Sequence, residues 1–137
     1  MTPSSKGGVS ADEPWLSVQA DRESHCVYAE WRGFANSSEF RASTMRILEA
    51  IQSIGAAALV SDNRRLEGVT EQDQLWLRDT WIPLVVNSGL RRIAVVVPGR
   101  GLGKIASEQI LAQEGMKAFS TRTFTTVSEA MEWAAEA

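Results

Sequence analysis

RRIAVVVPGRGLGK, residues 91–104, is the segment of the chain that says most about its fold. Its first half, residues 92–97, contains Ile, Ala and three Val, an apolar run typical of a strand that is covered on both faces. Its second half is a glycine-rich turn, residues 98–103, followed by a predicted helix that ends near Gly115. A buried strand, a tight turn and a helix in this order predict an α/β fold with parallel strands.

The preceding segments repeat this pattern. A short apolar run at residues 56–60 predicts another buried strand. A helix is predicted on each side of it. Asn36 and Glu39 form a capping box at the start of the first, which Gly55 ends, and Thr70 starts the second, which runs to about residue 87. Pro83 lies inside the second helix and should kink it, because proline lacks a backbone N–H.

The two ends of the chain complete the prediction. Residues 15–20 and 26–32 alternate between apolar and polar positions, which predicts a β-hairpin. Residues 117–124 predict a last strand, and Thr126 begins a last helix. We expect residues 1–13 to be a disordered tail, since they are polar and rich in Ser and Gly.

The predicted order is therefore ββαβαβαβα, in one α/β domain that spans residues 14–137. Helices between strands favour parallel pairing, and the first hairpin adds an antiparallel part. We expect a mixed sheet of about five strands, with about four helices distributed over both faces.

Composition excludes several classes of function. The net charge of −3 argues against a general nucleic-acid binder. A single cysteine, Cys26, and a single histidine, His25, cannot form a disulfide or a structural zinc site. The apolar runs are too short to span a bilayer, and residues 1–13 lack the apolar core of a secretory signal, so we expect a cytoplasmic protein.

Basic residues and glycines follow the predicted strands. Because the carboxyl ends of parallel strands meet at the ligand-binding edge of a sheet, we expect these loops to converge. The predicted site for a small anionic ligand, such as a nucleotide, a phosphorylated metabolite or a lipid headgroup, consists of Asp62, Asn63, Arg64, Arg65, Arg100, Gly101, Gly103 and Lys104. The alternative is that the arginines are merely solvated and the glycines provide backbone freedom.

No catalytic residues are predicted, and neither a metal nor a cofactor. No Ser or Cys has a neighbouring His that could activate it. Gly103-Lys104 is followed by Ile105, so the glycine-rich turn is not a Walker motif. Asp62 lacks an acidic pair after another strand, which a magnesium-dependent phosphoacceptor would need.

The helix that starts at Thr70 is apolar around more than one stripe. Trp76 and Trp81 accompany Leu, Ile and Val at positions that one sheet-facing stripe does not explain. We therefore predict an interaction surface at Trp76, Trp81 and Pro83 for a protein partner or a second copy of the chain. The alternative is that the kink at Pro83 lets the whole helix pack in one core.

These elements resemble the STAS superfamily, whose founding members are bacterial anti-sigma-factor antagonists. More narrowly, the chain resembles a group of short bacterial STAS-like proteins that are sometimes described together with CRAL-TRIO domains. The matching segments are residues 31–33, 59–62, 66–70, 81–83, 92–96 and 130–133, with Asp73, Trp76 and Phe124. They cover nearly everything after the tail.

The resemblance implies a non-enzymatic protein-interaction or sensing module without a cofactor. Classical members carry a phosphorylatable Ser directly after an Asp, at the start of a helix. Here Asp62 is followed by Asn63, which cannot accept a phosphate, and Ser61 precedes the Asp. We therefore expect a module without the usual phosphoserine switch.

Overall fold

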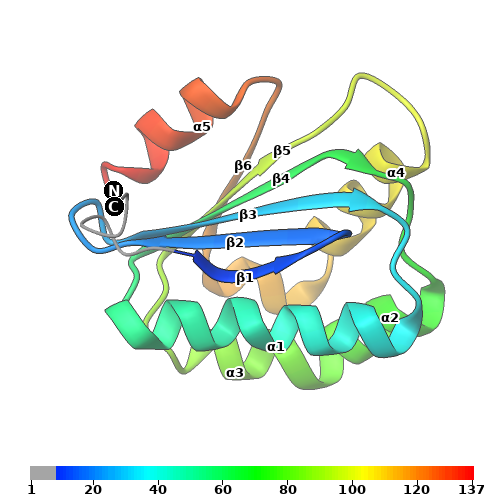
Figure 1. Ribbon diagram of the computed structural model, residues 1–137, viewed down its shortest axis with the longest axis horizontal. Helices are drawn as coiled ribbons and strands as arrows, with labels where there is room; N and C mark the ends of the chain where they lie inside the picture. The colour runs from blue at the N-terminus through cyan, green and yellow to red at the C-terminus, as the bar shows by residue number, and fades with distance from the viewer. Residues whose placement is uncertain (1–8) are drawn as a thin grey trace.

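Six strands form one mixed sheet through the centre of the computed structural model, which describes residues 9–137 (Figure 1). The strands are β1 (Val9–Glu13), β2 (Leu16–Asp21), β3 (Cys26–Gly33), β4 (Ala58–Leu66), β5 (Arg92–Val96) and β6 (Ser120–Phe124). The helices are α1 (Ser37–Ile54), α2 (Glu71–Trp76), α3 (Ile82–Val86), α4 (Leu102–Leu111) and α5 (Val127–Ala134). A π-helical turn η2 (Leu77–Trp81) joins α2 to α3, and a 3₁₀ turn η3 (Glu114–Ala118) follows α4.

The strands lie in the sheet in the same order as in the chain. The first three pair antiparallel, and β3 to β6 pair parallel. The predicted α/β class and mixed sheet are confirmed. With α2, η2 and α3 counted as one continuous helix, the four predicted helices are present as well.

Two predicted boundaries are wrong. Val9–Glu13 is not part of a disordered tail, because it pairs with β2 as the edge strand β1 and so adds a sixth strand. Residues 1–8 of the predicted tail lie outside the described residues. The strand predicted at residues 56–60 instead extends through five polar residues, 61–65, to Leu66.

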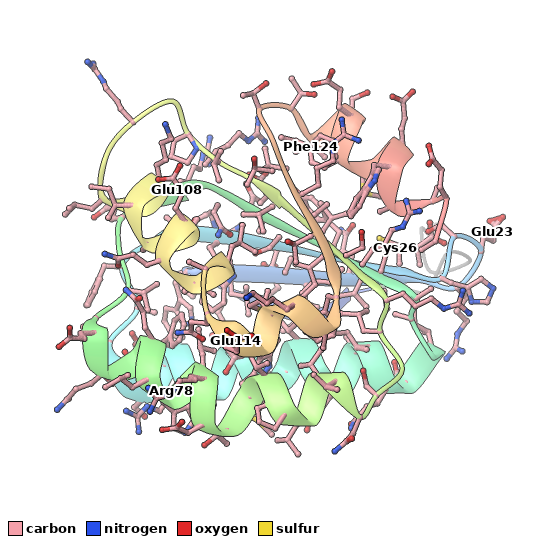
Figure 2. All side chains as sticks on the ribbon, turned by 180° about the vertical axis from the view of Figure 1, so that it is seen from behind. Glu23, Cys26, Arg78, Glu108, Glu114 and Phe124 are labelled. Carbon is pink, nitrogen blue, oxygen red and sulfur yellow. The ribbon has the colours of Figure 1, made fainter. Side chains whose placement is uncertain are left out.

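The helices form two unequal layers. The α1 helix, the α2–η2–α3 helix and α4 cover one face of the sheet, and α5 alone covers the other (Figure 1). Connections of one hand between strands added in one direction place their helices on one face. The smaller core, between the sheet and α5, contains Cys26, with Phe124 packed against it (Figure 2).

The ends of several helices are capped by residues close to them in sequence. The Asn36 side chain accepts from the backbone N–H of Glu39, and the Glu39 carboxylate accepts from that of Asn36, so the predicted capping box is confirmed. The side chains of Thr70 and Thr126 accept from the backbone N–H groups of Asp73 and Glu129 and so cap α2 and α5, without the reciprocal bond. Gly55 ends α1 with a φ of 60°, a conformation that glycine adopts without strain.

Pro83 perturbs its helix without ending it. The proline has no N–H to donate to the carbonyl four residues earlier. The turn before it, Leu77–Trp81, is wound as a π-helix, in which Ile82 donates its N–H to the Leu77 carbonyl. The helix thus continues past the proline, and its inner side remains packed on α1 and the sheet.

Within residues 9–137, every helix is too short or too polar to cross a membrane.

Gly103 marks the closest approach between α4 and β4. A Cβ at this position would lie 2.0 Å from the Leu66 carbonyl oxygen, whereas a Cβ at Gly99 would meet nothing within 4 Å. We predict that Gly103→Ala lowers the free energy of unfolding by about 1–3 kcal/mol or more, because backbone must shift to relieve the overlap. Urea denaturation measures this change.

Gly99→Ala, in the turn just before α4, is the matched control and should change stability by less than about 0.5 kcal/mol. Equal stabilities of the two variants would show that α4 does not approach β4 as described.

Candidate functional site

The predicted convergence of strand ends at one edge of the sheet is confirmed, but residues 62–65 do not form a loop at that edge. The parallel strands β3, β4 and β5 end at the same edge of the sheet. Asp62, Asn63, Arg64 and Arg65 nevertheless lie inside β4, not after it. Asp62 and Asn63 are therefore buried on opposite faces of the sheet and do not share one site.

Asp62 is held on the α5 side of the sheet. Tyr28 Oη donates to Asp62 Oδ2 at 2.9 Å. Arg64 Nε donates to Oδ1 at 2.9 Å and Nη2 donates to Oδ2 at 2.8 Å, a bidentate pair. The Asp62 residue is only 1% exposed, so it is enclosed by these partners.

The protonation states of this group follow from its contacts. Burial alone would raise the pKa of Asp62, but the hydrogen bonds from Arg64 and Tyr28 outweigh burial and lower the pKa. Burial, and then the hydrogen bond to Asp62, raise the pKa of Tyr28. A saturated, ionised carboxylate with a protonated phenol joins β3 to β4 and leaves no free base.

The basic side chains near this edge bond different partners and do not form one cluster. Arg64 is paired with Asp62. Arg32, which is not one of the predicted site residues, donates to the carbonyl oxygens of Glu13 and Pro14 and to the Glu30 carboxylate, and so joins β1 to β3.

The other basic residues of the predicted site make no such contacts. Arg65 and Arg100 are exposed and Lys104 is half-buried, and these three form no ion pair within residues 9–137. An anion site at this edge stays a prediction.

The two predicted glycines of the loop have structural reasons to be glycine. Gly101 precedes α4 with a φ of 102°, which a side chain would strain. Gly103 allows α4 to rest on the Leu66 carbonyl. Neither reason involves a ligand.

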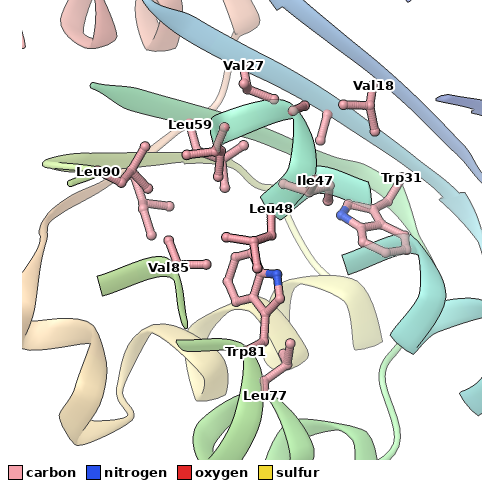
Figure 3. Close-up of a cluster of buried hydrophobic side chains, with 14 of the residues drawn as sticks. Val18, Val27, Trp31, Ile47, Leu48, Leu59, Leu77, Trp81, Val85 and Leu90 are labelled. Carbon is pink, nitrogen blue, oxygen red and sulfur yellow. The ribbon is translucent and has the colours of Figure 1, made fainter. Parts of the chain in front are cut away.

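The predicted tryptophan surface is wrong at Trp81. Its side chain is buried, Nε1 donates to the Thr44 carbonyl of α1, and Figure 3 shows the ring close to Leu48. Trp76 is half-buried under the Arg41 guanidinium, 5.5 Å from the ring centroid, and Pro83 is exposed. The alternative that the helix packs in one core describes Trp81 correctly.

A cavity of about 80 Å³, partly open to solvent, lies between the sheet and its three-helix layer. This volume is several times the roughly 10–15 Å³ that one water needs. The cavity lining contains no charged residue. Its apolar walls come from the strands, α1, the α2–η2–α3 helix, α4 and η3, and include Trp31, Leu59, Val95, Phe40, Ile47, Leu77, Trp81, Ile110, Leu111 and Met116.

One connected set of polar side chains lines the cavity, and we call it the Ser–Asn–Ser chain (Ser61, Asn63 and Ser107). Ser61 Oγ donates to Asn63 Oδ1 at 2.7 Å, and Asn63 Nδ2 donates to Ser107 Oγ at 2.9 Å. Ser107 Oγ donates in turn to the Gly103 carbonyl at 2.7 Å. These bonds pair most of the polar groups of the chain, which would be costly to bury without partners.

An irregularity in strand pairing shapes this wall. Between Glu30 and Arg32 the register of β3 against β4 shifts, so that Glu30 pairs with Asp62 and Arg32 with Arg65. One extra residue on β4 lets Asn63 and Leu66, three positions apart, both line the cavity. Strict alternation would place them on opposite faces.

Sequence reasoning missed the cavity, although one signal for it was present. Leu59, Ser61 and Asn63 occur at alternate positions, which predicts a common strand face with two polar members. The partners of that face, on α1, α4 and η3, are distant in sequence and carry no motif.

Other chemistry is scarce among residues 9–137. This part of the chain holds no group of three His, Cys, Asp or Glu side chains placed to bind a metal ion. Burial, with a smaller effect of Asp21, raises the pKa of the Cys26 thiol to about 11, so the thiol stays protonated.

Searches against family models, curated proteins and solved structures found no match to this chain. The STAS-like resemblance therefore stays a prediction, and the site must be argued from its own residues.

The Asp62 pair makes stability depend on pH. Because the folded-state pKa of Asp62 lies below its unfolded value of about 3.9, its contribution is present above that pH. The contribution is lost as the pH falls through the folded-state value. We predict that the free energy of unfolding falls more steeply in the wild type than in Asp62→Asn as the pH drops from about 5 to 2.

Asp79→Asn is the control for an exposed pair, because Arg78 bonds Asp79 in solvent, where screening is strong. Its pH profile should follow the wild type. Parallel profiles for the wild type and Asp62→Asn in urea titrations would refute the described role of Asp62.

Proposed function

We propose that this protein is a non-catalytic sensing module that binds a small, neutral, largely apolar molecule in the cavity beneath its sheet. The observation that carries the proposal is the cavity itself, about 80 Å³ in volume and without a charged lining residue. Protein interiors are normally close-packed, so a void of this size leaves its walls without contacts. A ligand that fills the void restores those contacts and stabilises the folded state.

The proposal of a non-catalytic role rests on the positions of the reactive groups. Asp62 is saturated by Tyr28 and Arg64, and Cys26 is buried on the α5 side, away from the cavity. His25 lies exposed in the β2–β3 turn. None of these groups lines the cavity. A binding module also agrees with what the STAS-like resemblance implies, an interaction or sensing role in bacteria.

The α2–η2–α3 helix would link the cavity to the surface. Its inner side contributes Leu77 and Trp81 to the cavity wall. Its outer side exposes Leu75, Leu84 and Val86. π-Helical turns of this kind occur frequently at functional sites. As a second candidate function, we propose that a protein partner or a second copy contacts this outer side.

Xenon binding tests the first proposal. Xenon enters dry apolar cavities, so we predict a protein-dependent shift of the xenon-129 NMR signal. Val69 lines the cavity and is half-buried, and Val69→Phe should remove most of the shift by filling the space. Val86→Phe, at an exposed position on α3, is the size-matched control and should retain it. A folded wild type without a shift would contradict the proposal.

Light scattering after size exclusion tests self-association. If the second copy is the partner, the protein elutes with twice the monomer mass and Leu84→Glu shifts it to the monomer. Leu102→Glu, at the opposite end of the helix layer and 70% exposed, should not. A monomer at every concentration would leave only a different protein as the partner.

A further inference from the structure

The hydrogen bonds of the Ser–Asn–Ser chain limit which polar group of a ligand the cavity can bind. Both serine hydroxyl hydrogens already donate to acceptors within the protein. The Ser61 hydroxyl hydrogen is given to Asn63, and the Ser107 hydroxyl hydrogen is given to the Gly103 carbonyl. Each of these oxygens keeps acceptor capacity, since a hydroxyl has two lone pairs. Toward a ligand, both serines are therefore acceptors.

Asn63 supplies the opposite function. Its amide nitrogen has two N–H groups, of which one donates to Ser107. The second N–H has no partner within residues 9–137, although Asn63 is buried. The chain thus presents one free donor flanked by hydroxyl acceptors.

The absence of charge in the lining excludes one class of ligand. A carboxylate or a phosphate in this cavity would be buried without a counter-charge, which is unfavourable. Arg64, the nearest arginine along β4, is paired with Asp62 on the opposite face of the sheet.

From these contacts we infer that the ligand is a small neutral alcohol, whose hydroxyl accepts from Asn63 and donates to a serine of the Ser–Asn–Ser chain. A ketone of the same shape uses only the Asn63 donor. An ether, a weaker acceptor, or a hydrocarbon, which forms no hydrogen bond, gains still less binding free energy from the Ser–Asn–Ser chain. The inference rests on the proposed function, because it names the ligand class of the same cavity.

The matched probes are butan-2-ol and butan-2-one, which have the same number of non-hydrogen atoms and differ at C2, which bears a hydroxyl in the first and is a carbonyl carbon in the second. Titration of each into the nitrogen-15-labelled full chain, followed at the indole N–H of Trp81, gives both dissociation constants. We predict that the alcohol binds roughly fivefold tighter or better, the effect of one neutral hydrogen bond. Butanoate should not bind.

Two serine variants test which side chain causes the preference for the alcohol over the ketone. Ser61→Ala and Ser107→Ala each remove an acceptor, and the alcohol-to-ketone ratio should fall below about two in at least one of them. Ser53→Ala is the control, because Ser53 bonds the Ala50 carbonyl on α1 and does not line the cavity. Because the readout is a ratio within one variant, a loss of stability does not imitate it.

The outcomes separate the two claims. Equal binding of alcohol and ketone, or an unchanged ratio in both serine variants, overturns the alcohol assignment and leaves a cavity that binds neutral molecules. If neither probe binds the folded wild type, the cavity function and the alcohol assignment both fall.

Discussion

The structure depends on two consecutive buried polar residues in its central parallel strand. Asp62 and Asn63 lie on opposite faces of β4, and each would be costly to bury without partners. Arg64 and Tyr28 bond the first on one side of the sheet, and Ser61 and Ser107 bond the second on the other, which leaves one Asn63 N–H without a partner within residues 9–137. The same bonds join β4 to β3 and to α4, so polar contacts fix the register of a sheet whose apolar contacts alone are less directional.

The two faces of the sheet at β4 differ in what their polar groups do. On the α5 side, the Asp62 carboxylate is enclosed and the group stabilises the fold. On the opposite side, the extra residue of β4 brings Asn63 and Leu66 to one wall, while Gly103 lets α4 approach. The cavity between the sheet, α1, α4 and the π-helical turn is lined on its strand side by Ser61 and Asn63 of the Ser–Asn–Ser chain. The β4 strand therefore carries both the buried Asp62 group that stabilises the fold and part of the wall of the proposed binding cavity.

Much of the fold could be predicted from local signals. The apolar run at residues 92–97 and the capping residues Asn36, Thr70 and Thr126 mark elements that local chemistry determines. The edge strand Val9–Glu13 could not be predicted, because it is mostly polar and is stabilised by pairing with β2. Among its residues 11–13, Ala11 lies in the main core.

The site was less predictable because its residues, like those of the edge strand, depend on contacts with other segments of the chain. Five polar residues, 61–65, continue β4. Tyr28 and Arg64 bond the buried Asp62 and Ser107 bonds the buried Asn63, and two of these contacts come from distant segments. Trp81 carries no local sign of its burial, since its partner carbonyl belongs to Thr44. A cavity is defined by what several segments fail to fill, and no single motif encodes it.

A crystal structure of the protein soaked with butan-2-ol would show whether the cavity binds an alcohol through Asn63. We expect electron density for the alcohol between Trp81 and Asn63, with its oxygen within hydrogen-bond distance of Asn63 Nδ2 and with the Asp62–Arg64 pair intact. Side chains that fill this space in the crystal, or alcohol bound only at the outer surface, would contradict it.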